Sequence, residues 1–314
     1  MPKISIVFFL LCTLIYAKDI KPIATLEASG LVSDVVEDHG LLYVATDAGV
    51  VDIIDLFTQK IVSQIHFDPI PSVMDGNVSA RVHSVDRYQG KTLLVTSGNT
   101  MYRNVWLHDG KKLRKIIDES KHLMPKDAYF TAEGKVVLGS FGSDIILYDN
   151  DESYKLYERH ISQSTMGGMT LTADKKKMLI ADESGAARLI DINSSRIEKT
   201  FTSEHVDNIY SVAYAKEILI TGGQDRRVGV YSTKGAYHLK SDFLVYCVGI
   251  SPSSKLGIYS SGLENHLQLF NTRNGKKLDR LIGHQSSPNR ILFIDEHLLI
   301  STGDEYTIYF WKLK

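Results

Sequence analysis

The sequence predicts an all-β protein in which seven four-stranded sheets stand around a central channel, a seven-bladed β-propeller. The first observation behind this prediction is an internal repeat. A similar apolar strand recurs along the chain, and each copy can be marked by the residue that follows its last large apolar position. These residues are Asp55, His108, Asp149, Asp191, Ser232, Asn271 and Lys312, and their successive separations are 53, 41, 42, 41, 39 and 41 positions. The second observation is that no segment after the first residues keeps a helical periodicity. A period near 41 residues with four short strands per unit is typical of a propeller blade.

Each unit has the same order of strands and turns. In the fifth unit, the stretch NIYSVAY (208–214) alternates large apolar and smaller residues, the period of a β-strand. It is followed by ILITGG and RVGVYST and then by a further strand. The intervening turns, such as TADKKK, SPSSK and NTRNGK, are rich in residues that tolerate turn geometry. We therefore expect one antiparallel sheet per unit.

Residues 1–17 are typical of a secretory signal peptide. Lys3 precedes an apolar run from Ile4 to Ile15, and Ala17 is a small residue suited to cleavage. The run is shorter than the roughly 20 residues that a membrane-spanning helix needs. An uncleaved N-terminal anchor and a buried strand are the alternatives. We expect an exported, periplasmic protein in which residues 18–314 form a single propeller domain, with no membrane attachment after cleavage.

The charge balance excludes some partners. Without Lys3 the chain keeps 35 of its 36 basic residues against 37 acidic ones. This balance gives no electrostatic reason to bind nucleic acid or an anionic membrane. Cys247, within FLVYCVGI, is the one cysteine outside the signal peptide, so an internal disulfide is excluded. We expect Cys247 to be buried in an ordinary apolar core.

The last unit raises the question of ring closure, because it supplies only three strands before Lys314. A spare strand, Ile20–Glu27, precedes the first unit and has no partner there. An unpaired sheet edge exposes backbone donors and acceptors and invites aggregation. We therefore predict that Ile20–Glu27 becomes the outer strand of the final blade.

The sequence carries no motif for catalysis, for a cofactor or for a metal. There is no G-x-S-x-G segment, and the eleven histidines are scattered without an H-x-H or H-x-x-x-H pair. The Gly pairs at 167–168 and 222–223 lack the Lys-Ser/Thr of a phosphate loop. We interpret the chain as a non-enzyme without a cofactor. One alternative is a quinoprotein-like enzyme, but such propellers carry a Trp motif in nearly every blade and this chain has two tryptophans. The other alternative is a lactonase-like enzyme, which needs carboxylates converging on the channel.

A binding surface is therefore the expected functional feature. The long first interval contains the insertion HFDPIPSVMDGNVSA (66–80), which is expected to be an irregular loop on the face shared by the inter-blade loops and the second turn of each blade. Such a loop is either a partner contact or a variable segment. Tyr and Arg on the same face suit protein interfaces. The candidates for protein binding are Asp68, Ile70, Val73, Met74, Arg81, Asn99, Met101, Tyr102, Arg103, Arg226 and Arg227.

Two N-x-S sequons lie in expected loops. DGNVS and DINSS both have an Asp two residues before the Asn, which resembles the extended acceptor of periplasmic oligosaccharyltransferases in some bacteria. Asn77 and Asn193 are therefore candidate glycosylation sites, with a chance match as the alternative.

The repeat is similar to that of the WD-repeat propellers. In the last unit Gly283-His284 opens the repeat, Asp304 lies in the second turn, and Trp311-Lys312 stands where Trp-Asp is usual. The resemblance covers all seven units, but one Gly-His pair and no intact Trp-Asp pair are present. It implies a structural hydrogen-bond network within a blade. The residues at the matching positions are His284, Thr302, Asp304 and Trp311 in the last unit, and His205 and Asp225 in the fifth.

With its leader, length and degenerate repeats, the chain resembles the NapL-type periplasmic accessory proteins encoded in nitrate reductase gene clusters. This resemblance implies a non-catalytic scaffold that contacts a periplasmic nitrate reductase subunit or a maturation factor. A general envelope assembly factor, with a different partner on the same face, is the alternative.

Overall fold

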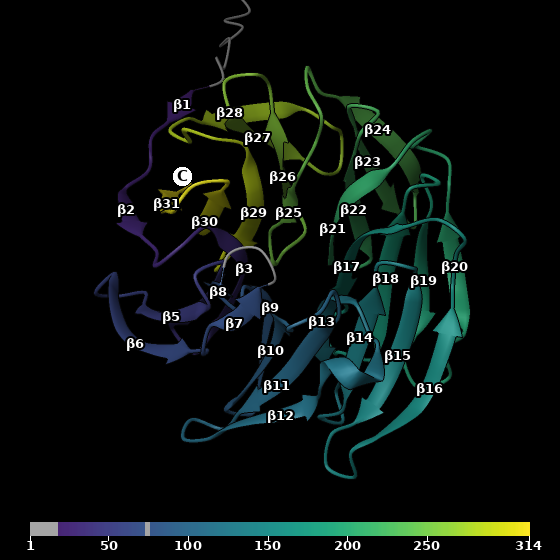
Figure 1. The fold of residues 1–314 in the computed structure, drawn as a ribbon. Coiled ribbons are helices and arrows are strands. Elements are labelled where there is room, and N and C mark those ends of the chain that lie inside the picture. The colour runs from purple at the N-terminus through teal and green to yellow at the C-terminus, as the bar shows by residue number, and fades with distance from the viewer. Residues whose placement is uncertain (1–17, 73–75) are drawn as a thin grey trace, which may run out of the picture.

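The computed structural model describes residues 18–72 and 76–314 and contains seven sheets arranged as a ring, with one additional two-stranded hairpin (Figure 1). The prediction of an all-β, seven-bladed propeller is confirmed. Helical structure in the described residues is limited to one 3-10 turn, η1 (Glu119–Lys121). In these parts of the chain, none of the helical structure is long and apolar enough to cross a membrane. The expected signal peptide, residues 1–17, lies outside the described residues.

Blades one to three are antiparallel sheets of four consecutive strands, counted from the channel outward. Blade one contains β3 (Val32–Asp38), β4 (Leu41–Thr46), β5 (Val50–Asp55) and β6 (Lys60–His66). Blade two contains β9 (Val82–Tyr88), β10 (Lys91–Ser97), β11 (Arg103–His108) and β12 (Leu113–Ile117). Blade three contains β13 (Pro125–Phe130), β14 (Val136–Ser140), β15 (Asp144–Asp149) and β16 (Tyr154–His160).

Blades four to seven repeat this order, except that the last blade supplies only three strands of its own. Blade four contains β17 (Met166–Leu171), β18 (Lys177–Asp182), β19 (Ala187–Asp191) and β20 (Ile197–Phe201). Blade five contains β21 (Ile209–Ala215), β22 (Ile218–Gly223), β23 (Arg227–Ser232) and β24 (Gly235–Lys240). Blade six contains β25 (Val248–Ile250), β26 (Leu256–Ser261), β27 (His266–Asn271) and β28 (Lys277–Leu281). Blade seven contains β29 (Pro288–Phe293), β30 (Leu298–Gly303) and β31 (Thr307–Lys312).

The N-terminal segment closes the ring. Strand β2 (Ala24–Glu27) pairs antiparallel with β31, with Ala24 opposite Phe310, as the outer strand of blade seven. The strand is shorter than predicted, because Ile20 lies in β1 (Asp19–Ile20), which pairs parallel with β28 of blade six. Pro22 lies between the two strands and has no N–H to donate to a ladder. The segment therefore ties blade six to blade seven.

The apolar core lies between adjacent blades. The second strand of every blade is buried along nearly its whole length, since both of its faces pack against neighbouring sheets. Between blades two and three, for example, Leu93 and Val95 pack in one buried cluster with Phe130. This packing explains why second strands such as LLYVAT read as nearly continuous apolar runs, whereas the outer strands are exposed.

The innermost strands are joined to one another by side chains and by close backbone contact. Asp34 accepts a hydrogen bond from the backbone N–H of Val85 at 3.0 Å, which links β3 to β9. Asp86 accepts from Phe130 N–H at 2.7 Å, which links β9 to β13. At the joint between blades four and five, a Cβ on Gly167 would lie 1.7 Å from the carbonyl oxygen of Ile209, so the strands approach too closely for any other residue.

Candidate functional site: the upper face

The face at which the innermost strands begin is called the upper face here. It carries the loops between blades and the turn between the second and third strands of each blade. Four large apolar side chains are exposed on it, with exposed fractions of 54–81%: Met101, Val206, Leu263 and Tyr306. Phe57, which is 97% exposed, lies on the opposite face, so exposure alone does not select an interaction surface and the surroundings of each side chain decide.

The loop that carries Val206 is held by a buried histidine, His205. Nδ1 of His205 lies 3.0 Å from Oδ1 of Asp225, and its Nε2 lies 2.8 Å from Oγ1 of Thr221. Oδ2 of Asp225 also accepts the backbone N–H of Val206 at 3.0 Å. Burial lowers the pKa of His205, and the Asp225 carboxylate opposes that shift. The neutral ring therefore donates from Nδ1 to the carboxylate and accepts from the threonine hydroxyl.

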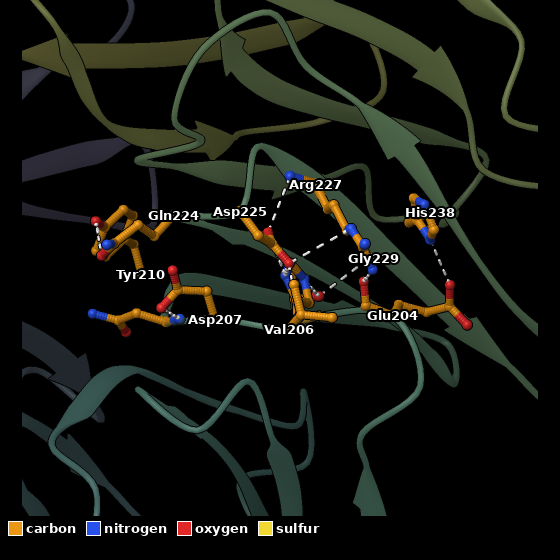
Figure 2. A network of polar contacts seen from close by, with 12 residues as sticks. Glu204, Val206, Asp207, Tyr210, Gln224, Asp225, Arg227, Gly229 and His238 are labelled. Carbon is orange, nitrogen blue, oxygen red and sulfur yellow. Dashed lines mark hydrogen bonds and ion pairs between the residues drawn. The ribbon is translucent and has the colours of Figure 1, made fainter.

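Further contacts fix both sides of this loop (Figure 2). Nδ1 of His238 lies 2.9 Å from a carboxylate oxygen of Glu204, and the Arg227 guanidinium donates to the Glu204 carbonyl at 3.2 Å. On the channel side, the Tyr210 hydroxyl donates to the Gln224 side-chain oxygen at 2.7 Å. Val206 is thus held in place with 73% of its surface exposed. A group ordered in advance costs little entropy when a partner binds.

Aromatic side chains lie on the same upper face as Val206, at the start of β21 and in the loop before β25. The rings of Tyr210 and Tyr246 stack with centroids 5.7 Å apart, and the ring of Phe243 lies 6.3 Å from that of Tyr246. All three are partly exposed, and Arg226 is exposed in the turn after β22. We call Val206, Tyr210, Arg226, Phe243 and Tyr246 the blade-five rim. Tyr and Arg are the residue types that carry much of the energy in protein interfaces.

Sequence analysis found only Arg226 of the blade-five rim. Tyr210 belongs to an alternating strand, and alternation does not show which side chains reach the rim of a channel. Phe243 and Tyr246 precede β25 in a stretch that reads as an apolar strand. The signal that could have found them is the turn residue pair Ser241-Asp242, which places the following aromatics in an inter-blade loop.

The insertion between blades one and two is a hairpin and not the irregular loop expected. Strands β7 (Ile70–Ser72) and β8 (Gly76–Val78) pair antiparallel, with Ile70 opposite Val78. Ile70 is consequently half-buried, whereas Asp68 is exposed. Val73 and Met74 lie outside the described residues.

A hollow of about 270 Å³ lies between this insertion and blade two. The ring of Phe67 meets the edge of Trp106 at 5.4 Å, and the Lys115 ammonium lies 4.7 Å from the Trp106 ring centroid. Nε1 of Trp106 donates to Thr96 at 2.9 Å, so the indole also braces the second and third strands of the blade.

The remaining candidates form two groups on different blades. Arg81 donates to the Ser33 hydroxyl at 3.2 Å, and the Tyr102 ring lies 4.7 Å from that of His122. Asn99 is exposed near Met101 in the same turn. Arg103 and Arg227, also predicted as partner contacts, are partly exposed and make contacts within the fold: Arg103 donates to the Pro125 carbonyl at 2.8 Å and lies over the Phe141 ring. The candidates in and before blade two (Arg81, Asn99, Met101, Tyr102 and Arg103) lie apart from the blade-five rim, because blades three and four separate them.

The polar network of the last blade corrects the assignment implied by the WD-repeat resemblance. His284 contacts Glu305 at 2.9 Å and Ser301 at 2.7 Å, and Nε1 of Trp311 donates to the same Ser301 hydroxyl at 2.8 Å. Thr302 and Asp304 instead contact Asn289, at 2.8 and 3.3 Å. Side chains alternate along a strand, so Ser301 and not Thr302 shares the face of Trp311.

The two sequon asparagines are both exposed. Asn77 lies in β8 on the insertion. Asn193 lies in the turn between β19 and β20, at the opposite face, where its amide donates to Glu133 at 3.0 Å.

The central channel contains groups of both charges. A cavity of about 320 Å³ is lined by Asp34, Lys126, Asp127 and Arg290 among other residues. Within residues 18–72 and 76–314, no group of three or more His, Cys, Asp or Glu side chains is placed to hold a metal ion. Burial raises the pKa of the Cys247 thiol to about 12, so this sulfur is not a nucleophile at neutral pH.

The fold and the upper face define a β-propeller of the kind typical of protein-interaction scaffolds. No protein-family model matches the chain. It is 23% identical over 211 residues to actin-interacting protein 1 of Caenorhabditis elegans, covering 63% of this chain and 34% of that protein. It is 22% identical over 173 residues to eukaryotic translation initiation factor 3 subunit I of Candida glabrata, covering 52% and 46%. The chain thus spans less than half the length of these relatives.

A solved structure shares the fold. The β-propeller domain of Cps50 (Swd1) from Myceliophteria thermophila superposes with a TM-score of 0.75 at 15% identity, covering 93% of this chain and 99% of that domain. Together with the blade structure, this similarity shows that the chain has the β-propeller fold.

Proposed function

We propose that this protein is an exported, non-catalytic scaffold that docks a partner protein on its upper face, at the blade-five rim. The observation that carries the proposal is the presentation of Val206, which is 73% exposed while the loop beneath it is fixed through His205 and Asp225. An exposed apolar group on a rigid support, on the same face as two tyrosines and an arginine, has the composition of an interface centre.

The partner belongs, in this proposal, to the periplasmic nitrate reductase system, as an enzyme subunit or a maturation factor. Support comes from the resemblance to NapL-type proteins together with the signal-like residues 1–17. Intact mass of the protein from periplasmic extract tests the export step: a chain starting at Lys18 is expected, and a chain retaining residues 1–17 in the cytoplasm contradicts it. The same spectrum tests Asn77 and Asn193, since a glycan adds mass to the bare chain.

The docking face is tested by quantitative co-purification from periplasm. The variant combines Val206→Asp with Tyr246→Ala and places a charge at the centre of the blade-five rim. The matched control is Phe57→Asp, which changes a side chain that is 97% exposed in the turn between β5 and β6 on the opposite face. We expect at least a tenfold loss of the captured partner for the rim variant and none for the control.

The outcomes separate the two parts of the proposal. Equal capture by the rim variant and the wild type rules out docking at the blade-five rim. A partner that depends on Val206 but is unrelated to nitrate reduction leaves the docking face in place and replaces the nitrate reductase assignment by that of an envelope assembly factor.

A further inference from the structure

The central channel contains a charged cluster that the docking surface does not use. Its cavity of about 320 Å³ is lined by the innermost strands of every blade except the second. Asp34 comes from β3, Lys126, Asp127 and Tyr129 from β13, and Arg290 from β29. Its volume lies at the lower end of the range of about 300–1,000 Å³ typical of small-molecule sites.

Arg290 is fixed at one edge only. Its Nε donates to Asp34 at 3.2 Å, and one Nη1 hydrogen bond reaches the Asn289 carbonyl at 3.3 Å. A guanidinium has five N–H donors, so several remain. Since 39% of the Arg290 side chain is exposed, within a cavity enclosed by strands, these donors are accessible from the channel.

Asp127 is the unusual member of the cluster. It is 6% exposed and lines the same cavity, and its carboxylate accepts no hydrogen bond from any residue that the structure describes. Lys126 is adjacent, but its ammonium donates to the carbonyls of Met166 and Gly167, at 3.1 and 2.5 Å. The Asp127 side chain lines the cavity, so a donor group of a ligand in the channel can reach its carboxylate oxygens.

The charges in the cavity balance. Asp34 and Asp127 carry two negative charges, and Lys126 and Arg290 carry two positive ones. A ligand with a single net charge would leave one charge in the cavity without an opposite partner, and such a charge makes binding less favourable. A ligand with one ammonium and one carboxylate keeps it. Such a ligand offers a donor to Asp127 and a planar acceptor to the free edge of Arg290.

We propose that the channel binds a small zwitterion of the α-amino-acid class, with its carboxylate on Arg290 and its ammonium group on Asp127. Tyr210 and Met169 also line the cavity and lie beside the ligand. The cavity shares Tyr210 with the blade-five rim, but Asp127 and Arg290 do not belong to that rim, so amino-acid binding at these two residues does not require the proposed docking function.

Isothermal titration calorimetry of the wild-type protein with each common L-α-amino acid tests the proposal. At least one is expected to bind with a Kd below about 1 mM, whereas propionate and n-propylamine, which each lack one of the two charges, bind at least tenfold more weakly. Failure of every amino acid to bind the folded protein overturns the proposal. So does equal binding of N-acetylated or amidated derivatives, because these have lost one charge.

A variant locates the site. Asp127→Asn keeps the shape of the side chain and is expected to weaken amino-acid binding at least tenfold. Asp151→Asn, in the exposed turn after β15, is the matched control and is expected to bind as the wild type does. Unchanged binding by a folded Asp127→Asn protein places any ligand elsewhere and contradicts the inference. The derivative series on the wild type decides the question if this variant fails to fold.

Discussion

The N-terminal segment is expected to be a main source of stability, and shortening it tests this. Three chains are compared, starting at Lys18, at Pro22 and at Ser29. The second chain lacks β1, and the third lacks β1 and β2. Removing β2 deletes Ala24 and Leu26, uncovers the cluster around Ile308 and Phe310 against which they pack, and leaves the edge of β31 unpaired.

The size of the effect follows from the lost contacts. Ala24 and Leu26 are mostly buried, and about four buried side-chain carbons contribute about 3 kcal/mol at about 0.8 kcal/mol per carbon. The backbone hydrogen bonds from Ile23 to Phe310 and from Ala28 to Tyr306, both 2.8 Å, add about 1 kcal/mol each. The total of about 5 kcal/mol is comparable to the whole stability of many domains. We therefore expect the chain starting at Ser29 to melt about 10 °C or more below the chain starting at Lys18.

Thermal unfolding followed by circular dichroism measures this difference. The chain starting at Pro22 should lose only a few degrees, because β1 has two residues and its Asp19–Arg280 ion pair is about 40% exposed. Ile23→Ser in the longest chain is the control, since Ile23 is 55% exposed. A melting temperature of the Ser29 chain within 2 °C of the longest chain would refute the closure of the ring by β2.

Two further predictions concern buried polar groups. Ser301→Ala should lower the free energy of unfolding in urea by about 2 kcal/mol, since it leaves His284 and Trp311 without their shared partner. The control, Ser286→Ala, should be nearly neutral, because the Ser286 hydroxyl has no partner among the described residues. Equal losses of stability in the two variants would contradict the corrected network. Burial, together with the charges of Arg103 and Arg81, lowers the pKa of His83 from 6.5 to about 3 in the folded protein, so protonation of His83 favours the unfolded chain. The contribution of His83 to stability should therefore be complete above about pH 6.5 and should decrease as the pH falls toward 3. A His83→Gln variant should lose less stability over this range in melts at stepped pH, and an identical pH profile would contradict the assignment.

The blade count could be predicted because each blade repeats one local pattern, and strand alternation and turn residues are local properties. The pairing of β7 with β8 in the insertion could not be predicted, since the two strands have three residues each and show no alternating apolar pattern. The His205–Asp225 contact followed from the position of both residues in a repeat, but the same reasoning chose Thr302 where Ser301 makes the contact. A shift of one residue along a strand reverses the face of every side chain, and a degenerate repeat does not fix the register.

The sequence by itself determined the repeat, the all-β class and the presence of a spare strand at the N-terminus, because these depend on residue type and spacing along the chain. Only the tertiary structure decided that this segment divides between blades six and seven, that Val206 and two tyrosines share a rim, and that Asp127 faces Arg290 in the channel. The physical reason is that ring closure brings together side chains from blades far apart in sequence. The local sequence pattern does not show which of these side chains point toward the channel.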